Sequence, residues 1–353
     1  MKLLVDAVGC GHGGISTYVS NLLLGWTDEF PNDDIVVLRG RADPLLDNPR
    51  IRSETLSGFG PELLSRPIAQ TNALRRLQNR FDAVLSVHPA TSLLRLNVPH
   101  AVVVHDLRHE LRPDQFSRSR RAIRKLSYGR GYALAGGFVC ISDRTQGDLH
   151  RLHPRHAGKP ATVVHHGADH VLAWPRAPIE PFVIGFGHHS NKNVDLVLQA
   201  WQTLCADEAP RYRLNIVGLS EAARSATLGL ARSLGVDESV VLSPYLDDED
   251  FHVLMAGCAA VLFPSDFEGF GLPVLEAMRL GKPVVVGPDA ALREVAQEHA
   301  TTIENFTVSA LAHGIRAALA QPPGALREAH EYATAFTWAR TARRTRKFLV
   351  TLE

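Results

Sequence analysis

Residues 264–278 read PSDFEGFGLPVLEAM and follow a short apolar run. The glycines at 269 and 271 lack a Cβ, so the backbone there can approach a ligand closely. Pro273 suits the first position of a helix, where its missing N–H costs nothing. The start of that helix offers free N–H groups and a positive dipole to an anion such as a diphosphate. Glu276, expected in the first helical turn, would accept hydrogen bonds from vicinal hydroxyls. The plainer interpretation is a strand–loop–helix unit with an acidic start and no ligand.

The same alternation of a short apolar run and a helix-length amphipathic segment repeats along most of the chain. The apolar runs are rich in Val, Ile and Leu, as is typical of parallel strands covered on both faces. The expected strands are Leu3–Ala7, Ile35–Leu38, Ala83–Val87, Ala101–Val104, Gly137–Ile141, Thr162–His165, Phe182–Phe186, Leu214–Val217, Val240–Leu242, Ala260–Phe263 and Pro283–Val286. This βαβ pattern predicts an α/β fold with doubly wound, Rossmann-like sheets.

The length and one proline-rich stretch predict two domains. A chain of 353 residues exceeds the size at which a single core usually keeps growing. The stretch WPRAPIEP at 174–181 carries three prolines in eight residues, which disfavours both a helix and a central strand. We therefore expect one domain at 1–176 and a second at 180–334. Residues 337–352 are expected to form a basic amphipathic helix.

Composition excludes some functions and leaves others open. Lys plus Arg (38) nearly equals Asp plus Glu (37), which argues against bulk nucleic-acid binding. The four cysteines are far apart and form no C-x-x-C pair, as expected in a reducing compartment. Asp6 interrupts the first apolar run, and no run approaches the ~20 apolar residues of a spanning helix. We expect a cytoplasmic protein, at most peripheral to the inner face of a membrane.

Two charged clusters have alternative interpretations. Arg118–Lys125 is a basic segment on an expected helix, with Ile123 and Leu126 between or beside the charges. It is either a solvated helix face or a contact for anionic lipid or a phosphorylated acceptor. Asp247–Asp250 resembles a metal-binding carboxylate cluster, but the apolar spacing after it favours a helix start. The seventeen histidines form no zinc-type set, and no metal is predicted.

The string EGFGLPVLEAM, with Glu268 and Glu276 separated by seven residues, closely resembles the E-x7-E signature of the family-four retaining glycosyltransferases. Weaker similarities follow in the family's order over nearly the whole chain. They are Gly13-Gly14-Ile-Ser-Thr-Tyr18, His105-Asp106-Leu107, Val139-Cys-Ile-Ser142, His166-Gly167-Ala-Asp169, Lys192-Asn193 and Phe336-Thr-Trp338. The resemblance implies the GT-B fold, two Rossmann-like domains facing across a cleft, with residues 335–353 packing back on the first. It also implies retention of anomeric configuration, no metal requirement and no cofactor.

The resemblance further implies a nucleotide-diphosphate sugar as donor and a hydroxyl on a sugar, lipid-linked sugar or small molecule as acceptor. Glu268 would contact the donor sugar, Glu276 the ribose, and Lys192 the diphosphate leaving group. The catalytic candidates are His105, Lys192 and Glu268. The donor-binding candidates are Gly13, Gly14, His188, Asn191, Lys192, Gly218, Tyr245, Leu246, Glu268, Gly269, Phe270, Gly271, Leu272 and Glu276. The acceptor-side candidates are His105, Asp106 and Ser142.

Two departures and two rival functions remain. His188 stands where many members have Arg, and His166 where many have Asn. Gly9-x-Gly11-x-x-Gly14, with Arg39 at the end of the next strand, matches the dinucleotide fingerprint and suggests an NADP-dependent oxidoreductase. A non-catalytic carbohydrate-binding protein is the third class. Neither rival gives the segment around Glu268 a catalytic role.

Overall fold

The computed structural model describes residues 1–11, 13–40, 48–56, 62–207 and 211–352. Its backbone divides into two units, Met1–Gly167 with Phe336–Glu353, and Ala168–Ala335. The chain passes between them at Gly167/Ala168, before the proline-rich stretch in which the sequence places the domain boundary, so residues 174–181 belong to the second unit. No helix in the described part of the chain is long and apolar enough to cross a membrane.

The first unit contains a seven-stranded parallel sheet in the order β3-β2-β1-β4-β5-β6-β7. The strand order reverses between β1 and β4, as in doubly wound folds. The strands are β1 (Lys2–Asp6), β2 (Asp34–Arg39), β3 (Ile51–Thr55), β4 (Ala83–Ser86), β5 (His100–Val104), β6 (Gly137–Cys140) and β7 (Ala161–Val163). The helices are α1 (Gly14–Glu29), α2 (Glu62–Leu77), α3 (Arg108–Leu111), α4 (Arg118–Leu134), α5 (Asp143–Leu152) and α13 (Trp338–Val350), with 3₁₀ turns η1 (Gln78–Arg80), η2 (Pro113–Gln115) and η3 (Pro154–His156).

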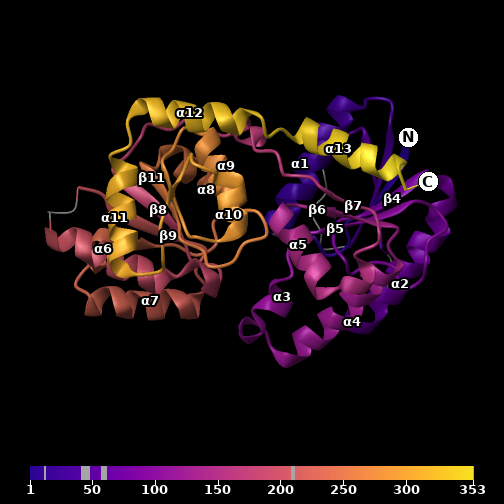
Figure 1. Ribbon diagram of the computed structural model, residues 1–353, viewed down its shortest axis with the longest axis horizontal. Coiled ribbons are helices and arrows are strands. Elements are labelled where there is room, and N and C mark those ends of the chain that lie inside the picture. Colours follow the sequence, from indigo (N-terminus) through magenta and orange to yellow (C-terminus); the bar gives the residue numbers. More distant parts are fainter. Residues whose placement is uncertain (12, 41–47, 57–61, 208–210, 353) are drawn as a thin grey trace. The chain divides into compact units, whose positions relative to one another are not determined.

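The C-terminal helix α13 belongs to this first unit, where it packs against α1 (Figure 1). Glycine permits the close approach: a Cβ on Gly25 would lie 2.6 Å from the Trp338 carbonyl carbon, and one on Gly167 would lie 2.3 Å from the Trp338 nitrogen. Arg346 of α13 also forms an ion pair with Asp33 at 2.7 Å. The last helix is therefore part of the first unit's core, although it is the last element in sequence.

The second unit contains a six-stranded parallel sheet in the order β10-β9-β8-β11-β12-β13. The strands are β8 (Phe182–Phe186), β9 (Arg213–Val217), β10 (Val240–Leu242), β11 (Ala260–Phe263), β12 (Val284–Val286) and β13 (Thr301–Thr302). The helices are α6 (Val194–Asp207), α7 (Glu221–Ser233), α8 (Asp248–Gly257), α9 (Leu272–Arg279), α10 (Ala290–Ala296), α11 (Val308–Leu319) and α12 (Pro323–Thr334), with 3₁₀ turns η4 (Asp169–Ala173), η5 (Ser190–Lys192) and η6 (Asp237–Ser239). In Figure 1 the strands lie between α6, α7 and α11 on one side and α9 and α10 on the other.

The expectation of doubly wound parallel sheets is confirmed, and each expected strand overlaps an observed one. Two strands, β3 and β13, were not predicted, and both lie at a sheet edge. β3 alternates buried and exposed residues in the sequence IRSET, and β13 has only two threonines. Edge strands need not be apolar on both faces, so neither carries the continuous Val/Ile/Leu run that marks the central strands. The expected helix start at Asp247 is also confirmed, because its side chain accepts a hydrogen bond from the Asp250 N–H at 2.9 Å.

Candidate functional site

The loop between β11 and α9 adopts the strand–loop–helix geometry expected for residues 264–278. Gly271 caps α9 with φ +99°, and a Cβ there would lie 2.5 Å from the Leu292 side chain, so only glycine fits. The helix begins at Leu272, which makes Pro273 its second residue and Glu276 its fifth. The expected first helical position for Pro273 and first turn for Glu276 were therefore wrong by one residue. The reason is that the left-handed Gly271 lets the helix start immediately after it.

A buried ion pair joins this loop to the loop after β8. Lys192 Nζ lies 2.5 Å from Glu268 Oε1, and the same oxygen accepts a hydrogen bond from Asn191 Nδ2 at 3.0 Å. Lys192 is only 4% exposed, and its ammonium lies 3.8 Å from the centre of the Phe263 ring. The pairing partners and the aromatic face offset the cost of burying the charge. A fixed cation and a carboxylate are thus held together at the carboxyl ends of β8 and β11, which are neighbouring strands.

The backbone around Lys192 is built to hold it in place. Asn191 Nδ2 also donates to the Phe267 carbonyl at 2.8 Å. Asn193 has left-handed geometry, with φ 53°, and its side chain donates to the Pro264 carbonyl at 2.8 Å. Asparagine is among the residues that tolerate this conformation. The two loops therefore support each other, and Lys192 has little freedom to move.

Glu276 is 4% exposed and has a partner that the sequence did not indicate. His170 Nε2 lies 2.9 Å from Glu276 Oε1. The two residues are 106 positions apart, and nothing in the pattern around His170 marks it. Only the packing of η4 against α9 brings them together.

The remaining donor candidates of the second unit follow β8, β9 and β10, so they lie at the same carboxyl edge of the sheet. Gly218 has φ +84°, its N–H donates to the Pro244 carbonyl at 3.1 Å, and a Cβ there would lie 3.1 Å from His188 Cβ. His188 is exposed, and Tyr245 is 66% exposed. An exposed Tyr245 argues against the alternative of a core residue.

In the first unit, the candidates likewise follow parallel strands at one edge. Gly13 and Gly14 follow β1 and open α1; Gly14 is exposed, and a Cβ there would meet no heavy atom within 4 Å. His105 follows β5, and its Nε2 lies 2.8 Å from the Val87 carbonyl. Because a carbonyl only accepts, Nε2 carries the proton. Burial lowers the pKa of His105 to about 4, so the ring is neutral near pH 7.

The other two acceptor-side candidates have local structural partners. Asp106 Oδ1 accepts a hydrogen bond from the Arg108 N–H at 2.9 Å, at the start of α3. Ser142 is fully buried and caps α5, where its Oγ accepts from the Thr145 N–H at 3.0 Å. These bonds explain both residue types by backbone needs. A role for either residue toward an acceptor stays a prediction.

Three further residues of this edge were not singled out from the sequence. His88 follows β4, with Nε2 2.9 Å from the Val8 carbonyl and Nδ1 accepting from the Ala90 N–H. Burial lowers the pKa of His88, and it too is neutral. Arg66 Nη2 donates to the same Val8 carbonyl at 2.6 Å. Gly9, with φ +85°, faces that guanidinium, since a Cβ there would lie 1.8 Å from Arg66 Nη2. The first glycine of the dinucleotide fingerprint is thus explained by this arginine, while residue 12 lies outside the described residues.

The histidine that replaces the family's asparagine has an internal role. His166 is 4% exposed and stacks on Trp338 of α13, with ring centres 5.7 Å apart. It also lies 4.9 Å from the ring of Tyr18. All three residues belong to the first unit.

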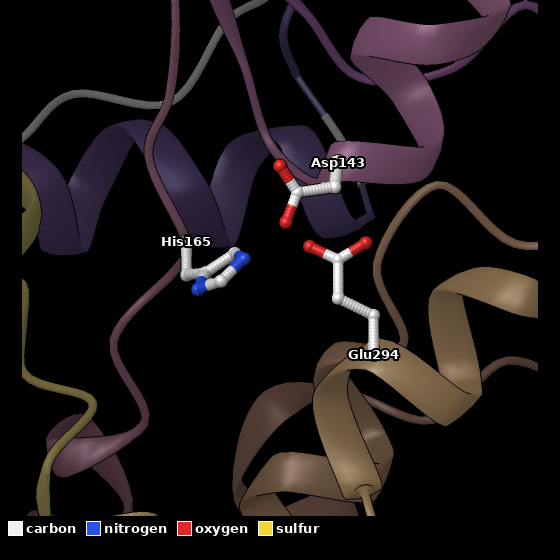
Figure 2. A group of neighbouring side chains, drawn as sticks. All are labelled: Asp143, His165 and Glu294. Carbon is white, nitrogen blue, oxygen red and sulfur yellow. The ribbon is translucent and has the colours of Figure 1, made fainter.

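Figure 2 draws the acidic residue at the start of α5 and the histidine after β7. A carboxylate oxygen of Asp143 and a ring nitrogen of His165 lie within 4.8 Å of each other. Zinc sites use at least three protein ligands, and these two are all that the first unit supplies in this group. Glu294, also labelled in Figure 2, belongs to the second unit. We build no metal site on these residues.

Two protein families match the chain, one over each half. Residues 12–172 match the model described as Glycosyltransferase Family 4, and residues 179–336 match Glycosyl transferases group 1. The chain belongs to the group 1 glycosyltransferases of family 4, and the two sheets have the GT-B architecture. HepE from Anabaena, solved in complex with UDP-glucose, shares this fold with a TM-score of 0.77 at 18% identity, covering 99% of this chain and 100% of that one.

Curated relatives match shorter parts. O-antigen chain mannosyltransferase B of Escherichia coli is 33% identical over 129 residues, which is 34% of this chain and 32% of that protein. The GDP-mannose-dependent alpha-(1-6)-phosphatidylinositol dimannoside mannosyltransferase of Mycobacterium tuberculosis is 29% identical over 197 residues, 55% of this chain and 48% of that protein. The chain thus matches less than half the length of either relative.

Proposed function

We propose that this protein is a retaining, metal-independent glycosyltransferase that moves a sugar from a nucleotide-diphosphate sugar to an acceptor hydroxyl, in glycan, glycolipid or natural-product glycoside synthesis. The observation that carries the proposal is the buried Lys192–Glu268 pair beside the start of α9, with Glu276 one turn into that helix. A diphosphate needs positive charge and free N–H donors, and a sugar and a ribose need carboxylate acceptors. All of these groups occur at one edge of one sheet.

The donor site would work by exchange of partners. In the structure Glu268 neutralises Lys192; with donor bound, Glu268 would accept sugar hydroxyls while Lys192 faces the diphosphate. The N–H groups of residues 269–272 would hold the sugar and phosphates. Negative charge on the leaving diphosphate grows as the glycosidic bond breaks, so a preorganised cation stabilises the transition state more than the ground state.

The identity of the donor is narrowed by what the relatives are named for. The mycobacterial relative is named as GDP-mannose-dependent, the Escherichia coli relative as a mannosyltransferase, and the solved HepE structure holds UDP-glucose. We therefore propose a nucleoside-diphosphate hexose, with GDP-mannose as the first donor to test and UDP-glucose as the second.

His105 would act on the acceptor side without serving as a strong general base. Its pKa of about 4 makes the ring a weak proton acceptor near pH 7, and general bases work best near the operating pH. We propose that the neutral ring positions the sugar or acceptor hydroxyl by hydrogen bonding. A phosphate oxygen of the donor would then receive the acceptor proton, in a front-face displacement.

Helix α4 supports a peripheral contact with an anionic membrane. It carries six Lys or Arg residues and no Asp or Glu, and its apolar residues Ile123 and Leu126 are 49% and 78% exposed. Two of the cations, Arg120 and Arg124, lie over the Phe116 ring at 5.8 and 5.2 Å. An exposed apolar strip flanked by cations suits the headgroup region of anionic lipid better than it suits water. A lipid-linked sugar is accordingly the acceptor class we favour.

The membrane contact is tested by sedimentation with vesicles of phosphatidylcholine containing about one third phosphatidylglycerol. Leu126→Ser should lower the bound fraction. Ile179→Ser is the matched control, because Ile179 is 72% exposed in the second unit and has no basic neighbours of this density. Equal binding by all three proteins would remove α4 from the proposal.

The proposed activity is tested by a thermal-shift panel of GDP, UDP, ADP, dTDP and NADP, followed by transfer assays with the matching sugar nucleotides. A ligand that binds only the folded state raises the unfolding midpoint. We expect a nucleoside diphosphate to do so and NADP not to. Saturable NADP binding without any nucleoside diphosphate response would favour the oxidoreductase, and binding of sugar nucleotides without turnover would favour a non-catalytic protein. Neither family match supports these two alternatives.

A further inference from the structure

The second unit contains a histidine–carboxylate pair whose geometry leaves half of the carboxylate available. His170 Nε2 lies 2.9 Å from Glu276 Oε1, and both side chains are largely buried, at 9% and 6% exposed. Glu276 Oε2 makes no hydrogen bond to any residue that the structure describes, and it is not among the enclosed polar atoms. One oxygen is therefore held by the protein, while the other remains open to a ligand.

The direction of the hydrogen bond follows from the chemistry of the two groups. An ionised carboxylate only accepts, so His170 Nε2 carries the proton and donates. This bond restricts rotation of the terminal carboxylate of Glu276, which would otherwise turn freely about its last torsion. A carboxylate fixed before the ligand arrives loses less conformational entropy on binding.

The histidine is itself held in place by aromatic packing. Trp174 meets the His170 ring edge-on, with centres 5.5 Å apart. On its other side, Trp174 stacks on His252 of α8 at 4.1 Å and 13° between planes. This arrangement connects the η4 segment to both α8 and α9. His170 therefore has a fixed orientation, which a residue that orients another residue requires.

We propose that His170 is a positioning residue for Glu276: it fixes Oε1 so that Oε2 accepts the ribose hydroxyls of the nucleotide. This inference rests on the proposed function, because it assigns the ribose to Glu276. It adds a residue outside the segment that resembles the family signature, and it explains why a histidine from the start of the second unit packs on α9.

The experiment compares nucleotides with and without ribose hydroxyls. Dissociation constants are measured by calorimetry for GDP and 2′,3′-dideoxy-GDP, with the UDP pair in parallel, on wild-type protein and His170→Ala. The variant should weaken ribonucleotide binding by about tenfold, as expected for loss of a buried polar contact. Binding of the dideoxy nucleotide should change less than twofold. His170→Gln, which keeps an N–H donor, should recover part of the loss.

His330→Ala is the matched control. His330 also contacts α9, with Nδ1 2.8 Å from the Arg279 carbonyl and Nε2 3.0 Å from Arg279 Nη1, but at the opposite end from Glu276. It should not distinguish the two nucleotides. Equal weakening of both nucleotides by His170→Ala, or no change in either, would overturn the inference. Wild-type protein that binds both equally would also overturn it and leave the proposed function intact. No binding of any nucleoside diphosphate would overturn both.

Discussion

The carboxyl edges of the two sheets carry different chemistry on the same scaffold. In the second unit, buried charges occur in pairs: Lys192 with Glu268, and His170 with Glu276. In the first unit, the buried groups His88 and His105 are neutral rings bonded to backbone carbonyls. Charge is costly to bury and is kept where a charged ligand repays it. The difference therefore indicates a diphosphate at the second unit and an uncharged hydroxyl group at the first.

Lys192→Ala should have the largest effect, because it removes the only cation proposed to face the leaving group. We expect kcat to fall by about 10²–10³-fold, with a smaller change in KM. Steady-state transfer from GDP-mannose or UDP-glucose measures this. The substitution also leaves Glu268 buried without its partner, which costs about 3–5 kcal/mol in comparable pairs.

Lys192→Met combined with Glu268→Gln controls for that folding cost, since it removes both charges together. If the double variant regains the unfolding midpoint but not turnover, the loss belongs to chemistry and not to stability. Normal turnover in Lys192→Ala would break the comparison at its charged side.

Glu276→Ala should act on affinity more than on rate. Removing a bonded carboxylate should weaken nucleoside diphosphate binding by about 1–3 kcal/mol, measured by calorimetry. Turnover at saturating donor should change much less, because the ribose is remote from the bond that breaks. If Glu276→Ala and Lys192→Ala both raised only KM, and by equal factors, the division of labour between the two residues would be wrong.

His105→Ala sharpens the neutral side of the comparison. We expect transfer to fall by about tenfold, the effect of one lost hydrogen bond to a reacting group, while the Kd for nucleoside diphosphate changes less than twofold. His156→Ala, on the half-buried η3 turn of the same unit, is the control. A loss of nucleotide affinity as large as the loss of transfer would place His105 with the nucleotide instead.

The smallest effect concerns stability and pH. Burial lowers the pKa of His100 to about 4 from 6.5, and Nε2 lies 2.9 Å from Ser86 Oγ. The unfolded chain therefore binds a proton that the folded chain refuses between about pH 6.5 and 4. Stability that is fully present above pH 6.5 is lost as the pH falls through this window, at up to about 1.4 kcal/mol per pH unit for one group.

Urea unfolding at several pH values tests this contribution. His100→Gln should flatten the dependence between pH 4 and 6.5, whatever its effect on stability at pH 7. An unchanged slope would mean that His100 takes up its proton while folded. His105 contributes with the same sign, so some slope should remain in the variant.

The sequence by itself determined the fold class, the central strands, the helix starts at Asp247 and Thr337, and the Glu268–Glu276 segment. Apolar runs, capping side chains and glycine–proline spacing are local, and the physics that reads them acts within a few residues. The shift of one residue at Pro273 and Glu276 marks the limit of that reading, because it depends on the backbone angle of Gly271. Edge strands β3 and β13 escaped it because partial exposure leaves no apolar run.

Only the tertiary structure decided which distant groups meet. Lys192 and Glu268 are 76 residues apart and come together because β8 and β11 are neighbours in the sheet. His170 reaches Glu276 across 106 residues, and Arg66 fills the space beside Gly9 from another helix. Strand order and helix packing set these contacts, and residue types along the chain do not encode them locally. Burial then makes each contact matter, because a paired charge or a neutral ring is what a low-dielectric site can hold.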